Sequence, residues 1–186
     1  SPLFFMRLLI FFLIYASSAS AQEMDSLAYA NMKAVVEFLA SDSLKGRASG
    51  STHEKIAADF IATKLKGSGF KVKRQKFSFV SDSLKYKSQN VIGFMNNHKD
   101  STLLITAHYD HLGMGEHKSL SQSGEVHNGA DDNASGVAIM LQLAEDLVDS
   151  IQDYNLLFVS YSGHELGLFG SRYFSEHLCR KYKKLA

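Results

Sequence analysis

The chain has 186 residues, of which 45% are hydrophobic and 21% are charged. This composition is typical of a globular domain and not of a disordered one. Lysine and arginine together number 20, and aspartate and glutamate 19, so the chain has no basic field of the kind that holds nucleic acid. The one cysteine, Cys179, excludes an internal disulfide framework and a zinc site built from several thiolates.

The first residues have the pattern of a secretory signal peptide. Met6-Arg7 is followed by an apolar run from Leu8 to Tyr15 and then by Ala19-Ser20-Ala21. A cationic start, a short apolar run and an Ala-x-Ala exit are the three parts of such a peptide. The run is too short to span ~30 Å of hydrocarbon as a membrane anchor. We therefore expect residues 1–21 to be a signal peptide and residues 22–186 to form the mature domain. The protein is expected to be secreted or periplasmic, with no stable membrane anchor.

After residue 25, hydrophobic periodicity predicts helices and strands that alternate along the chain. In chain order we expect a helix at 26–39, a loop at 41–51, a helix at 52–66, strands at 70–80, 90–95 and 102–107, a loop at 113–128, a helix at 133–147, a strand at 154–161 and a helix at about 167–182. The strand at 102–107 is apolar enough to lie in the centre of a sheet covered on both faces. The alternation favours an α/β layered fold in one domain.

Three short segments at expected strand-to-loop junctions contain closely spaced histidine, aspartate and glutamate residues: 107–113, 128–136 and 161–171. Open α/β sheets place their ligands beyond the carboxyl ends of strands. In the first segment, His108 and Asp110 are two residues apart and point to the same side of the chain. One of them can therefore ligate a metal while the other orients it. Taken alone, this segment is explained equally well by a buried histidine beside a turn.

The other two segments favour a metal site. Asp131 and Asp132 precede a helix within a frame of small residues, and a helix N-cap explains one of these acids but not both. His164 and Glu165 follow a strand that is apolar enough to be buried. Three such junctions with histidine and carboxylates in place of thiolates indicate a hard or borderline divalent metal, for which zinc is the leading candidate.

With these segments in their order, the chain resembles metallopeptidase family M28, a zinc aminopeptidase family that also includes the glutaminyl cyclases. The resemblance extends from Asp25 to His177, and its motifs lie at 39–47, 88–93, 108–113, 129–136 and 165–171. It implies an α/β fold with three layers, α/β/α, in which the middle layer is a mixed sheet, as in zinc exopeptidases. Residues 22–186 would be the N-terminal portion of such a domain, incomplete at the C-terminus.

The resemblance also implies roles for five residues. His108, Asp132 and Glu165 would ligate zinc, with Asp132 between two ions, and Asp110 would be the partner that orients His108. The family's remaining ligands, an aspartate and a histidine, would lie downstream of residue 186. His164 stands where the family usually has the glutamate that acts as general base, and an imidazole can also accept a proton near neutral pH.

The implied function is that of a zinc-dependent exopeptidase of the aminopeptidase type. It would hydrolyse the N-terminal bonds of peptide substrates through metal-activated water, with two zinc ions per complete domain. His164 motivates an alternative of another class, a non-catalytic binding protein with a peptidase fold. A glutaminyl-cyclase-like acyltransferase with a single zinc is a third hypothesis, which the intact His108 disfavours. We expect Lys45 and Arg47 to form a loop charge pair without a chemical role.

Overall fold

The computed structural model describes residues 26–115, 119, 124–178, 182 and 184–185. The expected signal peptide at 1–21 lies outside these residues. Within the described part of the chain, no helix has the length and apolar character needed to cross a membrane.

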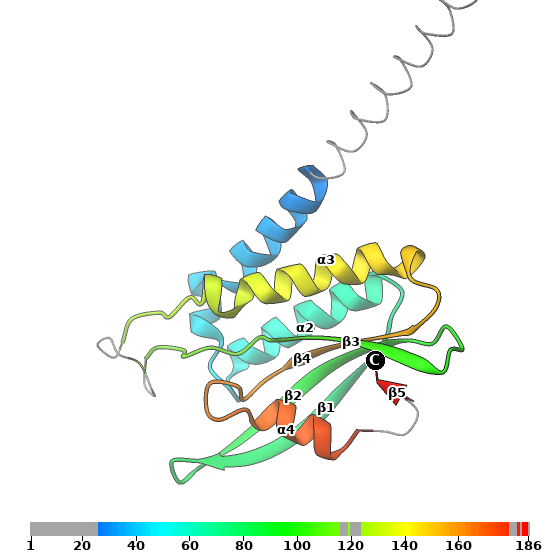
Figure 1. The fold of residues 1–186 in the computed structure, drawn as a ribbon. Coiled ribbons are helices and arrows are strands. Elements are labelled where there is room, and N and C mark those ends of the chain that lie inside the picture. Colours follow the sequence, from blue (N-terminus) through cyan, green and yellow to red (C-terminus); the bar gives the residue numbers. More distant parts are fainter. Residues whose placement is uncertain (1–25, 116–118, 120–123, 179–181, 183, 186) are drawn as a thin grey trace, which may run out of the picture.

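The strands form one mixed sheet in the order β1-β2-β4-β3-β5 (Figure 1). β1 pairs antiparallel with β2 and β2 with β4, whereas β3 lies parallel to β4 and to β5. Their bounds are Lys71–Ser81 for β1, Leu84–Met95 for β2, Ser101–His108 for β3, Asn155–Tyr161 for β4 and Lys184–Leu185 for β5. β4 is an almost continuous apolar segment that is buried up to Ser160, as expected for a strand covered on both faces.

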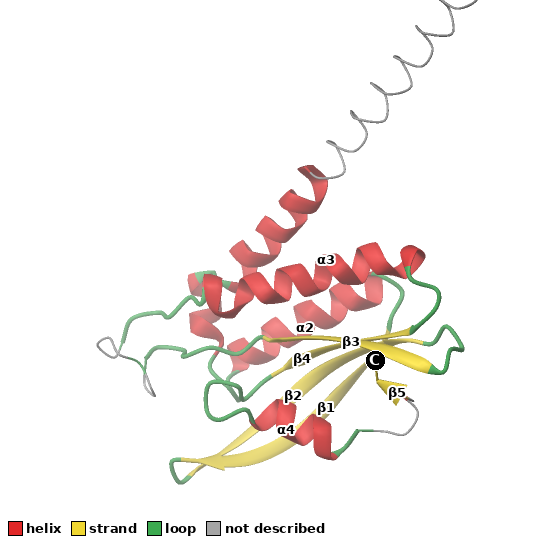
Figure 2. Cartoon of the chain, in the orientation of Figure 1, coloured by secondary structure: helices red, strands yellow, loops and turns green. Residues whose placement is uncertain are grey.

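Helices cover the two faces of this sheet unequally (Figure 2). The helix at 26–39, α2 (Thr52–Gly67) and α3 (Ser135–Ser150) pack with the sheet around the larger core. α4 (Phe169–Glu176) lies on the other face, where Phe174 packs in a smaller cluster with Leu157 and Val159. The protein therefore has the three-layer α/β/α arrangement, with a mixed central sheet, that the family resemblance implies.

The position of α2 follows from its local sequence. The Ser51 side chain accepts a hydrogen bond from the Glu54 backbone N–H at 3.0 Å and so caps the first turn. Its buried apolar residues recur at helical spacing and face the sheet; they are Ala57, Ala58, Ile61, Ala62 and Leu65. The N-terminal end of α2 lies beside β2, where Ser88 is bonded to Glu54.

Several element predictions are wrong in detail. The expected loop at 41–51 contains a 3-10 helix, η1 (Asp42–Arg47). β2 begins at Leu84, well before residue 90, because its polar first half pairs with β1 in a hairpin. α4 ends at Glu176 and does not reach residue 182.

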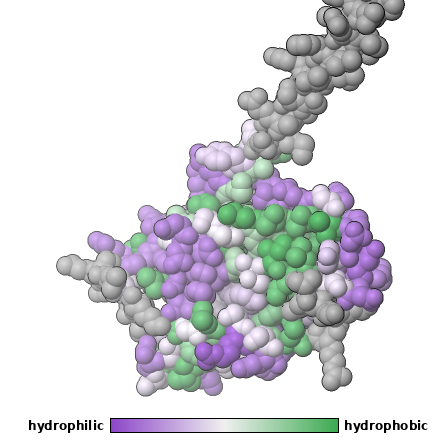
Figure 3. All heavy atoms as spheres, in the orientation of Figure 1, coloured by the Kyte–Doolittle hydropathy of each residue, from purple (hydrophilic) through white to green (hydrophobic). Residues whose placement is uncertain are grey.

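The expectation that residues 102–107 form the central strand is also wrong for the described part of the chain. β4 occupies that place, and β3 pairs on its other side only with β5, at Ser101 and Thr102. Leu103, Leu104 and Ile105 are only partly buried. Figure 3 shows hydrophobic residues at the surface over α3 and β3. The apolar character of a strand does not show whether both of its neighbouring strands pair with it along its whole length, or whether one of them pairs with it over only two residues, as β5 does with β3.

Candidate metal and catalytic site

The structure brings His108, Asp132 and Glu165 together. His108 ends β3, and Glu165 follows β4, which is parallel to β3, so both residues lie at the same edge of the sheet. Asp132 lies in η2 (Ala130–Ala134), directly before α3. His108 Nε2 is 3.0 Å from Asp132 Oδ1, and one ligand atom of each of the three residues lies within 4.8 Å of the others. The convergence expected from the sequence is therefore present.

These three side chains fit a divalent metal in number and chemistry. One imidazole and two carboxylates are ordinary zinc ligands at about 2.0–2.2 Å from the ion, so donors to a shared ion lie roughly 3–4 Å apart. Glu165 is mostly buried and is 3.2 Å from His111 Nδ1. This hydrogen bond is the main cause that lowers the pKa of the Glu165 carboxyl, and the nearby rings of His108 and His164 lower it further. A lowered pKa favours the ionised form that a metal requires. Asp132 is 59% exposed, which leaves its carboxylate accessible to an ion.

Asp110 supports the turn that follows β4. Its carboxylate is fully buried and accepts hydrogen bonds from Ser49 Oγ at 2.6 Å, from the His164 N–H at 3.2 Å and from the Glu165 N–H at 3.3 Å. Burial raises the pKa of this carboxyl, against the effect of the three donors. The side chain of Asp110 thus fixes the backbone that presents His164 and Glu165.

The direct contact of Asp110 with His108 is made by its backbone. His108 Nδ1 lies 3.2 Å from the Asp110 carbonyl oxygen and 3.8 Å from Oδ1. Donation from Nδ1 to this carbonyl leaves the Nε2 lone pair directed at Asp132, as a metal ligand requires. The structure therefore gives a geometric basis for the expectation that Asp110 orients His108, but the contact is made by the backbone carbonyl of Asp110 and not by its carboxylate.

His164 lies against His108 and outside the group of candidate ligands. The two imidazole rings are stacked face to face, with centroids 3.8 Å apart and planes 9° from parallel. The His164 carbonyl accepts hydrogen bonds from the N–H groups of Gly167 and Leu168, which close the turn after β4. The ring thus stands beside the metal site on a fixed backbone.

Arg47 is a site residue that the sequence interpretation missed. The prediction of a loop charge pair with Lys45 is wrong, because Arg47 is fully buried. Its guanidinium donates to the carbonyl oxygens of Tyr109 at 3.0 Å, Asn128 at 2.7 Å and Gly129 at 3.0 Å, and also to that of Leu39. Burial lowers the pKa of this group to about 10, so it stays charged at neutral pH. Arg47 therefore links the loop of His108 to the loop that leads to Asp132.

Substitution of Arg47 is expected to weaken both folding and metal binding. Arg47→Ala leaves several buried carbonyls without a donor, at about 1–3 kcal/mol each in the free energy of unfolding. Arg47→Lys keeps the charge but replaces a planar five-donor group by a compact ammonium, so it should recover only part of the loss. Urea unfolding and zinc titration would measure the two effects. Lys45→Gln is the matched control because Lys45 is exposed, and an equal effect from that variant would contradict the role of Arg47.

A second buried polar group lies beneath the site. Glu54 is 2% exposed; its carboxylate accepts from the Gly50 N–H at 2.6 Å, and Ser88 Oγ is also bonded to it. The Tyr109 hydroxyl lies 2.7 Å from the Gln89 carbonyl and 3.0 Å from Glu54 Oε1. These contacts donate to the carboxylate and favour its ionised form, but burial outweighs them and raises the pKa of Glu54.

This raised pKa predicts a pH-dependent difference in stability. The folded state holds the Glu54 proton more tightly than the unfolded state, so its contribution is complete below the unfolded pKa of about 4.3 and declines as pH rises through the folded value. Glu54→Gln, which resembles the neutral acid, should therefore gain stability relative to the native protein as pH rises. Urea unfolding between pH 4 and 8 would measure this difference. Glu37→Gln, at an exposed position, is the control, and a pH-independent difference for Glu54→Gln would contradict the prediction.

Comparison with known proteins identifies the class to which this fold and site belong. The model of peptidase family M28 matches residues 90–186, which is just over half of the chain. The chain belongs to peptidase family M28.

Similar proteins come from several bacteria. Aminopeptidase YwaD of Bacillus subtilis (strain 168) is 30% identical over 165 residues, which cover 83% of this chain and 32% of that protein. The crystal structure of Fimbriiglobus ruber glutaminyl cyclase superposes with a TM-score of 0.72 at 20% identity, over 84% of this chain and 58% of that one. A leucine aminopeptidase precursor from Bacteroides thetaiotaomicron gives 0.68 at 20% identity, over 84% and 58%. These structures share the fold, and the chain spans less than two thirds of each of the three proteins.

Proposed function

We propose that this chain provides the metal-binding part of a zinc-dependent aminopeptidase that acts on peptides outside the cytoplasm. The convergence of His108, Asp132 and Glu165 is the observation on which the proposal depends. Membership of peptidase family M28 and similarity to an aminopeptidase support the reaction class. The pattern of residues 1–21 supports export, which mass spectrometry of the mature N-terminus would test.

In this proposal, His108, Asp132 and Glu165 would hold the zinc. Bound zinc would polarise the scissile carbonyl and lower the pKa of a water molecule. His164, stacked beside His108, accepts the proton of the attacking water and returns it to the leaving amine. Asp110 holds the backbone N–H groups of His164 and Glu165 and so fixes the distance between base and ligand.

The full-length protein provides the test. We expect purified protein to contain zinc by elemental analysis and to release p-nitroaniline from aminoacyl p-nitroanilides. Chelation should abolish turnover and zinc addition should restore it. Zinc-loaded protein that hydrolyses no aminoacyl or peptide substrate would contradict the proposal.

Two other functions give different results in the same assay. The fold shared with glutaminyl cyclase makes cyclisation of an N-terminal glutamine the second candidate, and this reaction releases ammonia without consuming water. A non-catalytic binding protein, which His164 motivates, would bind peptides and show no turnover. Supplying a glutaminyl peptide and a peptide without N-terminal glutamine separates the three functions.

A further inference from the structure

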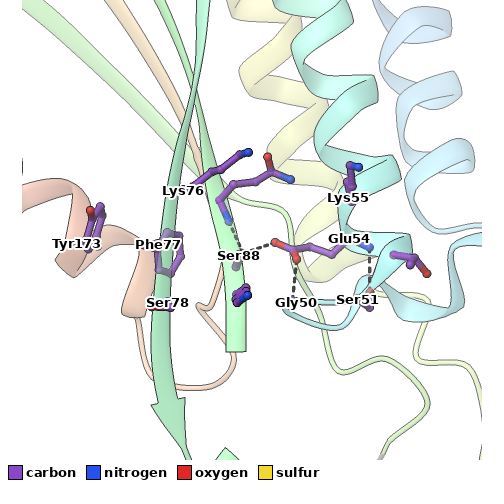
Figure 4. Close-up of a pocket in the computed structure, with 12 residues that line it drawn as sticks. Gly50, Ser51, Glu54, Lys55, Lys76, Phe77, Ser78, Ser88 and Tyr173 are labelled. Carbon is purple, nitrogen blue, oxygen red and sulfur yellow. Dashed lines mark hydrogen bonds between the residues drawn. The ribbon is translucent and has the colours of Figure 1, made fainter. Parts of the chain in front are cut away.

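An open groove of about 720 Å³ lies beside the metal site, between the N-terminal end of α2 and the hairpin of β1 and β2. Figure 4 shows its side chains: Lys55 on α2 and Lys76 on β1 lie on the two sides of the contact between Glu54 and Ser88. Phe77 and Tyr173, whose rings are stacked at 5.3 Å, line its far end. None of the residues to which we assign catalysis or zinc binding lines this groove.

The groove has a positive charge that the protein itself does not neutralise. Lys55, Lys76 and Lys87 line it from three different elements, and all three are exposed. Among the described residues, no carboxylate forms an ion pair with any of these lysines. The first turn of α2 adds the partial positive charge of a helix N-terminus.

Glu54 is the one acidic residue that lines this groove in the described part of the chain. It does little to offset the lysines, because its carboxyl is buried and bonded to Gly50 and Ser88. Burial also raises its pKa and so favours the neutral acid. The groove therefore presents cationic groups around a floor with little negative charge.

The groove is continuous with the metal site. Gly50 and Ser51 line both the groove and a smaller cavity of about 260 Å³, which His111 and Glu165 also line. Ser49, in the same cavity, donates to Asp110. A chain that begins at the candidate ligands can thus pass over residues 49–51 and enter the groove.

From this arrangement we infer that the groove binds the acidic downstream residues of a peptide whose N-terminus lies at the metal site. Carboxylate side chains of such a peptide pair with Lys55, Lys76 and Lys87, and their aliphatic parts pack on Tyr173. This inference depends on the proposed function for the location of the peptide N-terminus. It adds a preference for substrates with aspartate or glutamate after the scissile bond.

Binding of an acidic peptide can be measured without catalysis. The probe is hexaglutamate with an acetylated N-terminus, which blocks trimming by an aminopeptidase, and a C-terminal fluorophore. Fluorescence anisotropy with the zinc-loaded full-length protein should show binding that weakens as salt rises, because exposed charges are screened over about 10 Å at 0.1 M salt. The triple variant Lys55→Gln/Lys76→Gln/Lys87→Gln should bind on the order of tenfold more weakly, since three individually weak, exposed ion pairs are lost together.

The matched control is Lys66→Gln/Lys71→Gln/Lys73→Gln, which removes the same charge at exposed positions that do not line the groove. It should bind hexaglutamate as the native protein does. The His108→Ala variant should also bind hexaglutamate, because His108 does not line the groove. Binding in the groove can therefore be tested even if the proposed zinc site is wrong. Equal losses in both triple variants, equal binding of hexaglutamine, or equal binding of an oligothymidylate would overturn the inference.

Kinetics test the connection with the metal site. For substrates with two glutamates after the first residue, the groove variant should raise KM on the order of tenfold and leave kcat unchanged, because these contacts are the same in the ground and transition states and each exposed pair is weak. Substrates with glutamines at these positions should be unaffected. An unchanged KM for the acidic substrate in an active enzyme would overturn the inference.

Discussion

Asp132→Ala is expected to lower turnover by about 10³-fold or more, because the metal supplies several kcal/mol of transition-state stabilisation and each 1.36 kcal/mol is tenfold in rate. The carboxylate of Asp132 is 3.0 Å from His108 Nε2 and belongs to the three-residue cluster. Its removal leaves one imidazole and one carboxylate among the described candidate ligands. Zinc content after dialysis should fall together with the rate.

The adjacent acid provides a matched control. Asp131 lies in the same segment, η2, and is exposed, but its carboxylate is not part of the converging group. Asp131→Ala should therefore keep its zinc and most of its activity. Steady-state rates and elemental analysis of the two variants would test the assignment, and equal losses in both variants would show that Asp132 has no special role.

The sequence predicts the cluster because two of its members lie at strand ends and the third directly precedes a helix. β3 and β4 are apolar and parallel, so His108 and Glu165, at or just after their carboxyl ends, have to lie near each other. Asp132 precedes an amphipathic helix whose buried face is evident from the sequence. In each case the local pattern determines the element, and the element determines the position of the ligand.

Arg47 could not be predicted in the same way. Its partners are backbone carbonyls of Tyr109, Asn128 and Gly129, and any residue type provides a carbonyl. The charge alone suggested an exposed side chain, which is the usual place for arginine. Its position in the M28-like motif at 39–47 was the one available indication.

The lysine-lined groove also depends on tertiary structure. Lys76 and Lys87 belong to opposite strands of a hairpin, and Lys55 belongs to a helix that packs against the same sheet. Because the second strand is expected from the sequence to start at residue 90, the hairpin segment that contains Lys87 falls outside that prediction. If the pairing of β1 with β2 is not known, the net charge of +1 for the whole chain does not reveal that three lysines gather in one groove.

His164→Ala is expected to lower kcat by roughly 10²–10⁴-fold, the usual contribution of a positioned general base. The stacking of His164 on His108 provides a second explanation for such a loss, because alanine also removes a contact of a candidate ligand. His164→Phe separates the two explanations, since phenylalanine retains a flat ring against His108 but accepts no proton. It should be as slow as the alanine variant while its zinc content equals that of the native protein.

His164→Glu places the family's usual carboxylate at this position. Because the side chain is outside the group of candidate ligands, this variant should preserve or raise turnover without changing the zinc content. A protein that has lost catalysis and retains only binding would instead show no turnover in its native form and no change on substitution by alanine or phenylalanine. Steady-state rates and zinc contents of the native protein and the three variants distinguish these views. A native rate in His164→Phe would exclude His164 as the base, because a phenyl ring cannot take the proton of the attacking water.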